Sequence, residues 1–263
     1  MTAIKKIGRY CSTDNEGYIV NDSDIGKVGP EFHKVIRKVK DAYLHYLGED
    51  IHSIYIRGSI PRGLGLMGVS DLDTIAVTNK KSNDLDLHWV EQTEQEINDE
   101  FDCVNGVELS FYYINDILDT SFFSIIPFML KTHSICVFGK DVTIDLPNFK
   151  ADKRLANEHL VNLRSQIQQA QIDLTGNEDP EDIKDCCIWI MKIVIRAGLA
   201  LVMINRVYTR DLYPAYKLFS VNFPEQEPLM RKALHYAIAP TTNADSLLEF
   251  INNFGIWLVK EAG

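Results

Sequence analysis

Two apolar stretches, residues 54–56 and 75–77, enclose a glycine-rich connection and a pair of aspartates. Branched apolar residues in such runs are typical of β-strands. Asp71 and Asp73 open the second strand, and because side chains alternate along a strand, both project to one face while Leu72 points into the core. Carboxylates this close repel each other unless a cation lies between them, and Mg²⁺ takes one or two carboxylates together with substrate phosphates. The pair is therefore a candidate metal site.

The connection before the aspartates has the features of an anion site. Gly58 and Ser59 follow the first strand, so free backbone N–H groups and a hydroxyl would meet at a turn or helix start. Arg62 adds a cation one short turn later. Further glycines let a ligand approach the backbone closely; they are Gly63, Gly65 and Gly68. Taken singly, a Gly-Ser turn is a common strand connection and an Asp-x-Asp pair is often solvated, but together they indicate nucleotide chemistry.

Composition narrows the class of partner. The 263 residues carry a formal net charge of −10, which argues against a nucleic acid as the bulk substrate because a phosphate polymer usually meets a basic face. An acidic surface suits cationic small molecules, and many neutral ones too. A hydrophobic content of 46% is enough for one large or two ordinary domains.

The cysteines and the longest apolar run indicate the cellular compartment expected for this protein. The five cysteines are odd in number and form no Cys-x-x-Cys pair, which favours reduced thiols in a cytoplasmic protein over a disulfide or zinc framework. Residues 1–9 lack the apolar core of a signal peptide. The run 186–204 contains Lys192 and Arg196, so we expect a buried helix and no membrane association.

The order of elements predicts an α+β fold, in which a small mixed-sheet domain precedes a C-terminal α-helical bundle. In the first half we expect helices at 30–48, 88–101 and 121–131 and a strand at 134–137. From about residue 151 the pattern is helical, with helices expected at 151–174, 181–205, 211–221, 225–238 and 243–260. The predicted domains are 1–149, including an N-terminal extension 1–30 with a hairpin near 14–17, and 150–263.

A further strand is predicted at residues 106–114, where aromatic and branched residues alternate. Glu108 shares a face with Ser110 and Tyr112 and lies opposite to the apolar face of the strand. If this strand pairs beside the Asp71 strand, Glu108 becomes a third carboxylate near the aspartates. Without that pairing, a lone glutamate on a half-exposed strand is an ordinary solvated residue.

Gly58-Ser59, eleven residues and then Asp71-Leu72-Asp73 resembles the signature of the DNA polymerase beta nucleotidyltransferase superfamily. The layout resembles the aminoglycoside nucleotidyltransferases, above all the streptomycin and spectinomycin adenylyltransferases. Only the first half carries a specific motif, although the layout covers most of the chain. The resemblance implies that Glu108 is the family's third acid, which is a general base in the antibiotic-modifying branch and a metal ligand in polymerases. Arg57 stands where the family usually has an apolar or aromatic residue, and it either joins Arg62 at the phosphates or points to solvent.

The second half resembles the family more weakly. Arg210, in Thr209-Arg210-Asp211, holds a position where the family usually has a phosphate-binding lysine, but a surface arginine is equally expected there. Asp182 and Asp185 lie in an acidic run that either complements a helix dipole or forms an anionic wall for a polyamine-like antibiotic. A tryptophan that helps to bind the drug in some relatives has no identifiable counterpart.

The resemblance implies a Mg²⁺-dependent enzyme that transfers a nucleoside monophosphate, AMP from ATP, to a hydroxyl of a small molecule. Cationic molecules such as aminoglycosides are candidate acceptors. Two alternatives stay open, a nucleotidyltransferase with a protein or RNA acceptor and a nucleotide-binding regulator without turnover. The regulator is favoured if Glu108 faces away from the aspartates. The acceptor, the preferred base and the choice between monomer and homodimer are not determined by the sequence.

Overall fold

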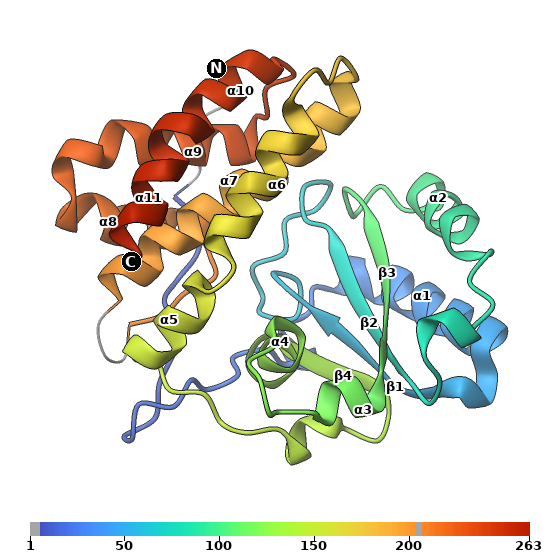
Figure 1. Ribbon diagram of the computed structural model, residues 1–263. Helices are drawn as coiled ribbons and strands as arrows, with labels where there is room; N and C mark the ends of the chain where they lie inside the picture. The colour runs from blue at the N-terminus through green and yellow to red at the C-terminus, as the bar shows by residue number, and fades with distance from the viewer. Residues whose placement is uncertain (1–5, 204–206) are drawn as a thin grey trace. The chain divides into compact units, whose positions relative to one another are not determined.

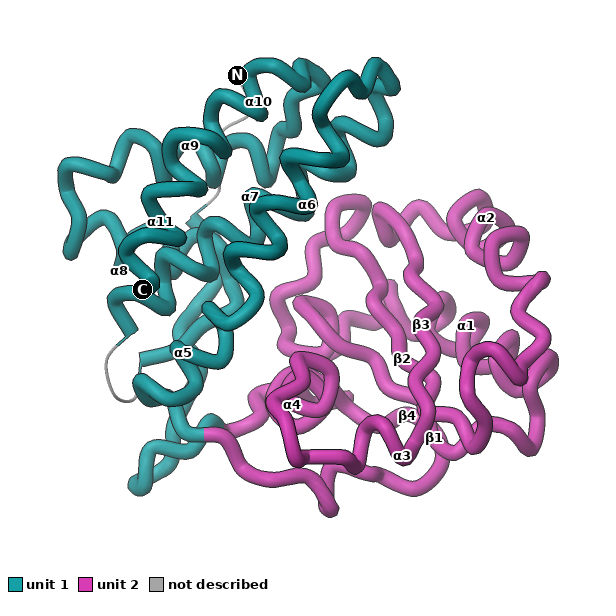
Figure 2. The backbone as a smooth tube through the Cα atoms, viewed as in Figure 1, with its two compact units in different colours: residues 1–19, 150–263 teal, residues 20–149 magenta. Residues whose placement is uncertain are grey.

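The computed structural model describes residues 6–203 and 207–263 (Figure 1). These residues form two compact units (Figure 2): residues 20–149 make up one, and the described residues up to 19 join 150–263 in the other. The first unit contains a sheet and the second is helical, so the predicted α+β fold class is confirmed. The predicted domains 1–149 and 150–263 stay a prediction, although the segment before residue 20 groups with the helical unit.

The sheet of the first unit has four strands in the order β3-β2-β1-β4. Its strands are β1 (Ile51–Arg57), β2 (Leu72–Thr78), β3 (Val107–Tyr113) and β4 (Ser134–Gly139). β1 runs antiparallel to both β2 and β4, whereas β2 and β3 are parallel, so the sheet is mixed. All four strands lie where alternating or branched apolar residues predicted them.

Helices cover both faces of this sheet (Figure 1). They are α1 (His33–Leu47), α2 (Val90–Glu100), α3 (Ile114–Leu118) and α4 (Ile125–His133). One face buries Ile54, Ile56 and Leu72 against apolar residues of α1 and α2. The other buries Tyr55 and Ile75 in a smaller cluster with apolar residues of α3, α4 and the short 3₁₀ turn η5 (Val142–Asp145). Apolar side chains of β1 and β2 therefore fill both faces of the sheet, as in a sheet covered on both sides.

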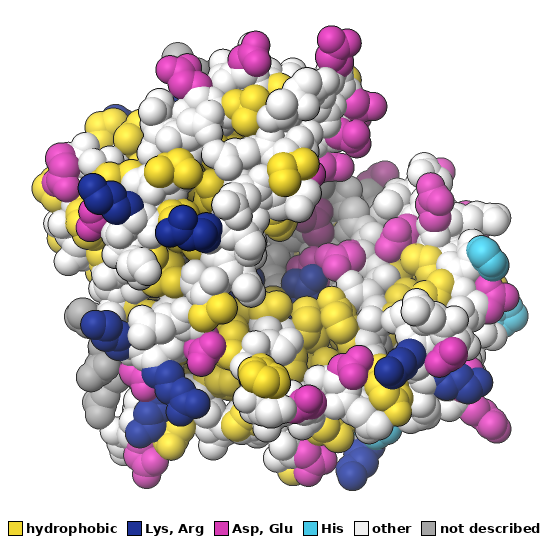
Figure 3. Space-filling model, in the orientation of Figure 1, with side chains coloured by type: hydrophobic (Ala, Val, Ile, Leu, Met, Phe, Trp, Pro, Cys, Tyr) yellow, Lys and Arg dark blue, Asp and Glu magenta, His cyan; other side chains and the backbone are white. Residues whose placement is uncertain are grey.

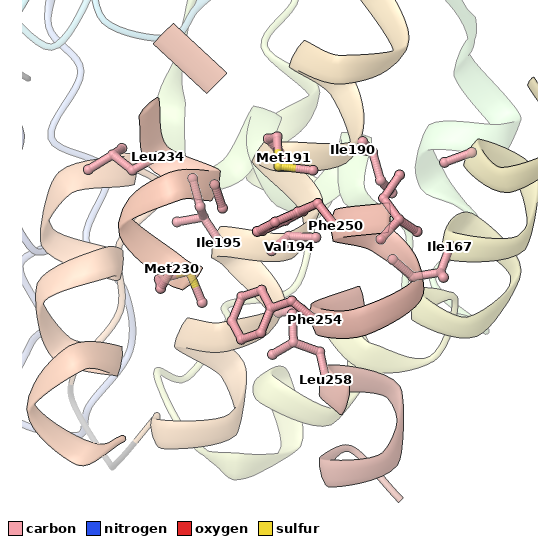
Figure 4. Close-up of a cluster of buried hydrophobic side chains, with 14 of the residues drawn as sticks. Ile167, Ile190, Met191, Val194, Ile195, Met230, Leu234, Phe250, Phe254 and Leu258 are labelled. Atoms are coloured by element: carbon pink, nitrogen blue, oxygen red, sulfur yellow. The ribbon is translucent and has the colours of Figure 1, made fainter. Parts of the chain in front are cut away.

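The helical unit is built around one long helix, α7 (Pro180–Val202). The others are α5 (Lys153–Leu160), α6 (Leu163–Leu174), α8 (Leu212–Asn222), α9 (Glu227–Ile238), α10 (Ala244–Phe250) and α11 (Ile256–Glu261). Side chains of α6 to α11 interdigitate in a continuous apolar core (Figure 4). Within the described residues, no helix combines the length and the apolar character needed to cross a membrane.

Two of the predicted helices are interrupted. The helix expected at 151–174 divides into α5 and α6 beside Asn162, a residue type that favours helix starts over helix interiors. The helix expected at 243–260 contains a π-helical turn, η7 (Ile251–Gly255), between α10 and α11. Helical periodicity continues across both interruptions, so the sequence pattern did not reveal them.

The predicted N-terminal hairpin is present as a short turn. Thr13 bridges Ile19, and the backbone N–H of Asp14 donates to the carbonyl of Tyr18 at 2.9 Å. The segment is held to the helical unit, where the N–H of Cys11 donates to the carbonyl of Tyr208 at 2.7 Å. Residues 6–19 of the N-terminal extension therefore belong to the helical unit, whereas residues 20–30 belong to the unit that contains the sheet.

Phe254 is 0% exposed in the core of the helical unit and contacts the Trp257 ring in a stacked arrangement. Truncating such a phenylalanine removes buried apolar area and leaves a cavity. We expect Phe254→Ala to lower the free energy of unfolding by about 3–5 kcal/mol, measured by urea denaturation. The matched control is Val221→Ala at a 75% exposed position, which should change it by less than about 0.5 kcal/mol. Similar losses in the two variants would contradict the packing described.

Candidate functional site

A row of charged side chains crosses three strands of the sheet. Arg57 on β1 is paired with Asp73 on β2, and Asp73 is paired with Glu108 on β3. Directly paired residues of neighbouring strands present their side chains on the same face. The predicted pairing of the Glu108 strand beside the aspartate strand is thus confirmed, and Glu108 faces the same side as Asp73.

The Arg57 guanidinium bridges the two acids of this row. Its Nη2 lies 3.1 Å from Glu108 Oε2 and 3.5 Å from Asp73 Oδ1. The Arg57 side chain is 17% exposed, compared with 26% for Asp73 and 52% for Glu108, so the cation is the most buried member. The sequence left two positions open for Arg57, beside Arg62 or in solvent. The structure shows a third, as counter-ion to the candidate catalytic carboxylates.

The Asp73 carboxyl is strongly influenced by its surroundings. Burial raises its pKa to about 6, the Arg57 charge opposes that rise, and the negative charges of Glu108 and Asp71 add to it. Near neutral pH the Asp73 carboxylate therefore carries a poorly hydrated negative charge. A cation bound beside it would be stabilised by this environment.

Asp71 and Gly58 complete the edge of the row. Asp71 lies immediately before β2 with an exposed side chain, and its Oδ1 accepts a hydrogen bond of 3.0 Å from Asn105 Nδ2. Gly58 has a φ of +89°, and a Cβ at this position would lie 2.6 Å from Asp73 Oδ2. Glycine at position 58 thus lets the chain turn while the Asp73 carboxylate lies against its backbone.

The connection after Gly58 folds back as a series of turns and does not begin a helix. The N–H of Leu64 donates to the carbonyl of Ser59 at 2.9 Å, and the hydroxyl of Ser59 lies 3.2 Å from that of Ser70. Among the residues that the structure describes, no acceptor takes the backbone N–H of Ser59 or Ile60. Two backbone donors and a hydroxyl thus lie in the turn next to Asp73, in the place where the sequence predicted an anion site.

Arg62 forms a buried ion pair in the unit that contains the sheet. Its side chain is 2% exposed, and its Nε donates to Asp22 Oδ1 at 2.9 Å. This buried pair fastens the segment before α1 to the glycine-rich connection. Contact between Arg62 and phosphates stays a prediction, and the burial of the guanidinium does not favour it. Sequence reasoning missed Asp22 because no local pattern links residues so far apart in the chain.

Arg210 lies in the helical unit, half-buried before α8. Removal from water and the charges of Arg210 and Arg196 lower the pKa of His159 to about 3. The His159 Nε2 lies 3.0 Å from the Tyr208 hydroxyl, and the two rings stack. Arg210 and Arg196 therefore place two positive charges near a neutral histidine. Contact of Arg210 with a nucleotide stays a prediction.

Asp182 and Asp185 are exposed near the start of α7. Asp179 caps this helix by accepting hydrogen bonds from the N–H groups of Glu181 and Asp182. Acidic side chains gather at this end of the helical unit in the space-filling view (Figure 3). Acids in the first turns complement the helix dipole, which accounts for both residues. A role for them in binding an acceptor stays a prediction.

The candidate metal ligands can be tested against the geometry. Within 6–203 and 207–263, no three side chains of histidine, cysteine, aspartate or glutamate converge as a metal cluster. Arg57 explains this, because its guanidinium lies between Asp73 and Glu108. Asp71 and Asp73 still provide two oxygen donors at the open edge of the row, which is the number that Mg²⁺ usually takes from a protein. Three ionised carboxylates and one guanidinium leave two negative charges, which one divalent cation would neutralise.

Comparison with known proteins finds likeness in structure but no match in sequence. No protein-family model matches the chain, and no curated protein matches it in sequence. A solved structure that resembles it is spectinomycin adenyltransferase AAD(9) from Enterococcus faecialis with ATP and spectinomycin. The identity is 15% over 85% of this chain and 99% of that one, with a TM-score of 0.47. By its name, that protein is one of the spectinomycin adenylyltransferases that the layout of this sequence resembles. With this identity and TM-score, the function of this chain has to be inferred from its own residues.

Gly58→Ala tests the close approach of Asp73 to the turn. Gly176 has a similar φ of +72° but no atom near its would-be Cβ, so Gly176→Ala is a matched control for backbone strain alone. We expect Gly176→Ala to lower the free energy of unfolding by about 1–2 kcal/mol. Gly58→Ala should lower it further, because the methyl group collides with Asp73. Equal losses in urea denaturation would show that Asp73 does not lie against Gly58.

The low pKa of His159 predicts a pH-dependent stability. An unfolded histidine has a pKa near 6.5, so between about pH 6.5 and 3 the unfolded chain binds one proton more than the folded chain. The neutral His159 therefore makes its full contribution to the free energy of unfolding above pH 6.5, and this contribution is lost as the pH falls. His159→Gln should reduce the drop in unfolding free energy between pH 7 and pH 5 by about 2 kcal/mol. The control His45→Gln, at an exposed histidine, should leave the drop unchanged.

Proposed function

We propose that this chain is a Mg²⁺-dependent nucleotidyltransferase, which transfers AMP from ATP to a hydroxyl of a small acceptor. The observation that carries the proposal is the pairing of Asp73 with Glu108 on adjacent strands, beside the Gly58–Ser59 turn. Carboxylates for a cation, donors for phosphate and a third carboxylate for a proton are the groups that this reaction needs.

Asp71 and Asp73 are the proposed Mg²⁺ ligands. Bound Mg²⁺ would orient the triphosphate and neutralise charge on the departing pyrophosphate. The two residues have different local supports, since Asn105 holds the Asp71 carboxylate and the Gly58 backbone lies against that of Asp73. Both oxygen donors are thereby oriented from the protein side.

Gly58 and Ser59 are the proposed phosphate-binding residues. The N–H groups of Ser59 and Ile60, together with the Ser59 hydroxyl, offer donors of the kind that bind phosphate oxygens. The nearby glycine leaves the backbone accessible on this side. Arg62 and Arg210 remain candidates for the same phosphates only as predictions from the sequence.

Glu108 is the proposed general base. The acceptor's hydroxyl oxygen forms a bond to the α-phosphorus, the bond to the bridging oxygen breaks, and pyrophosphate leaves with that electron pair. The hydroxyl proton passes to a carboxylate oxygen of Glu108. Ser110 Oγ donates to Glu108 Oε1 at 2.6 Å and Arg57 holds Oε2, so the carboxylate is oriented before any acceptor arrives.

The alternatives differ in how the structure bears on them. A nucleotide-binding regulator without turnover would be favoured if Glu108 faced away from the aspartates. Glu108 instead shares a face with Asp73. This orientation supports turnover. The net charge of −10 supports a cationic small acceptor, an aminoglycoside among them, in the cytoplasm. A protein or RNA acceptor remains an outcome that the experiment below would detect.

The test is Asp73→Asn, assayed by mass spectrometry for AMP addition to a panel of aminoglycosides, with ATP and Mg²⁺. We expect transfer to fall about a thousandfold or more, equivalent to about 4 kcal/mol of transition-state stabilisation, with the circular dichroism spectrum unchanged. The control Asp116→Asn removes an exposed carboxylate of the same unit and should retain activity. Turnover that persists in Asp73→Asn would refute the assignment. Label on added protein or RNA instead of a drug would change only the acceptor.

A further inference from the structure

Arg57 occupies the position between two of the proposed functional carboxylates. Its Nη2 approaches both Glu108 Oε2 and Asp73 Oδ1, at 3.1 and 3.5 Å. Neighbouring carboxylates repel each other unless a cation lies between them, and in a two-metal site that cation is a metal ion. Here the shared cation is part of the chain itself.

The row around Arg57 is held in place from the opposite face of the sheet. Thr74 is buried, and its hydroxyl donates to the carbonyl of Glu108 at 2.7 Å. The hydroxyl of Tyr43, on α1, lies 2.8 Å from that of Thr74. These bonds fasten the backbone of Glu108 to β2, so the spacing of Glu108 and Asp73 is set by the sheet. Arg57 lies in the space between these two carboxylates.

The properties of arginine favour this position between two carboxylates. A guanidinium keeps its charge at all ordinary pH values and pairs well with carboxylates. A divalent cation between Asp73 and Glu108 would have to displace a like charge that is 17% exposed and contacts both acids. A divalent cation at Asp71 and Asp73 Oδ2 displaces no such charge, because Arg57 contacts Oδ1 of Asp73. The geometry thus separates one accessible cation position from one that is already filled.

We infer that Arg57 takes the place of a second metal ion, so that the site binds one divalent cation, at Asp71 and Asp73. The inference rests on the proposed function, because it concerns the same carboxylates. Arg57 is a positioning residue in this scheme: it neutralises Asp73 and orients Glu108 without touching the reacting atoms. Removing its charge leaves three carboxylates without an internal counter-ion and opens a second cation position.

The experiment counts bound Mn²⁺ by electron paramagnetic resonance of the free ion. The protein chain and α,β-methylene-ATP are present at equal concentrations, above the Kd of their complex. Calorimetry determines this Kd first. We expect one Mn²⁺ per complex for the wild-type chain and two for Arg57→Met and Arg57→Gln. Arg57→Lys, which keeps the charge, should bind one. So should Lys38→Met, which removes the cation of the exposed Lys38–Glu100 pair in the same unit.

The outcomes separate the inference from the proposed function. Two Mn²⁺ ions in the wild-type complex would overturn the inference and leave the proposed function standing. The inference would also fall if both neutral Arg57 variants, shown to be folded by circular dichroism, still bound one ion. If the wild-type chain bound no nucleotide in the presence of Mn²⁺, the proposed function would fall and the inference with it. Glu108→Gln added to Arg57→Met should return the count to one, which locates the second ion.

Discussion

The ion pairs of Arg57 with Asp73 and Glu108 are the interaction on which the site depends. Two acidic side chains on adjacent strands repel each other, and the half-buried position of Asp73 increases the cost of its charge. The guanidinium reduces that cost and fixes the direction of both carboxylates. An acidic site suitable for a cation can therefore exist in the folded chain before any ligand binds.

The sheet gives these side chains their fixed spacing. Apolar residues of β1 and β2 fill both faces, so the sheet is held between α1 and α2 on one side and α3 and α4 on the other. The polar row lies at the end of β2 where the glycine-rich connection enters. Functional groups at the ends of buried strands combine a rigid base with access for ligands. The Gly58 turn adds backbone donors at the same place.

Much of the fold and part of the site were predictable from local patterns. Alternating and branched residues located all four strands, and the two-residue period placed Glu108 on the face opposite to Leu109. Helical periodicity located the longer helices but neither the five-residue α3 nor the interruptions beside Asn162 and at η7. Contact of Arg62 with a phosphate stays a prediction, and its buried ion pair with Asp22 was not foreseen from the sequence. Long-range ion pairs of this kind leave no periodic signal.

The sequence by itself determined the strands, the spacing of Asp71 and Asp73 and the face that Glu108 takes, because these follow from backbone geometry over a few residues. Only the tertiary structure decided that Asp73 is paired with both Arg57 and Glu108. The physical reason is that a long connection does not fix the register of the strands that it joins, and a shift of one residue would turn Arg57 to the other face. The packing of both faces of the sheet selects that register, and with it the cation that lies between the acids.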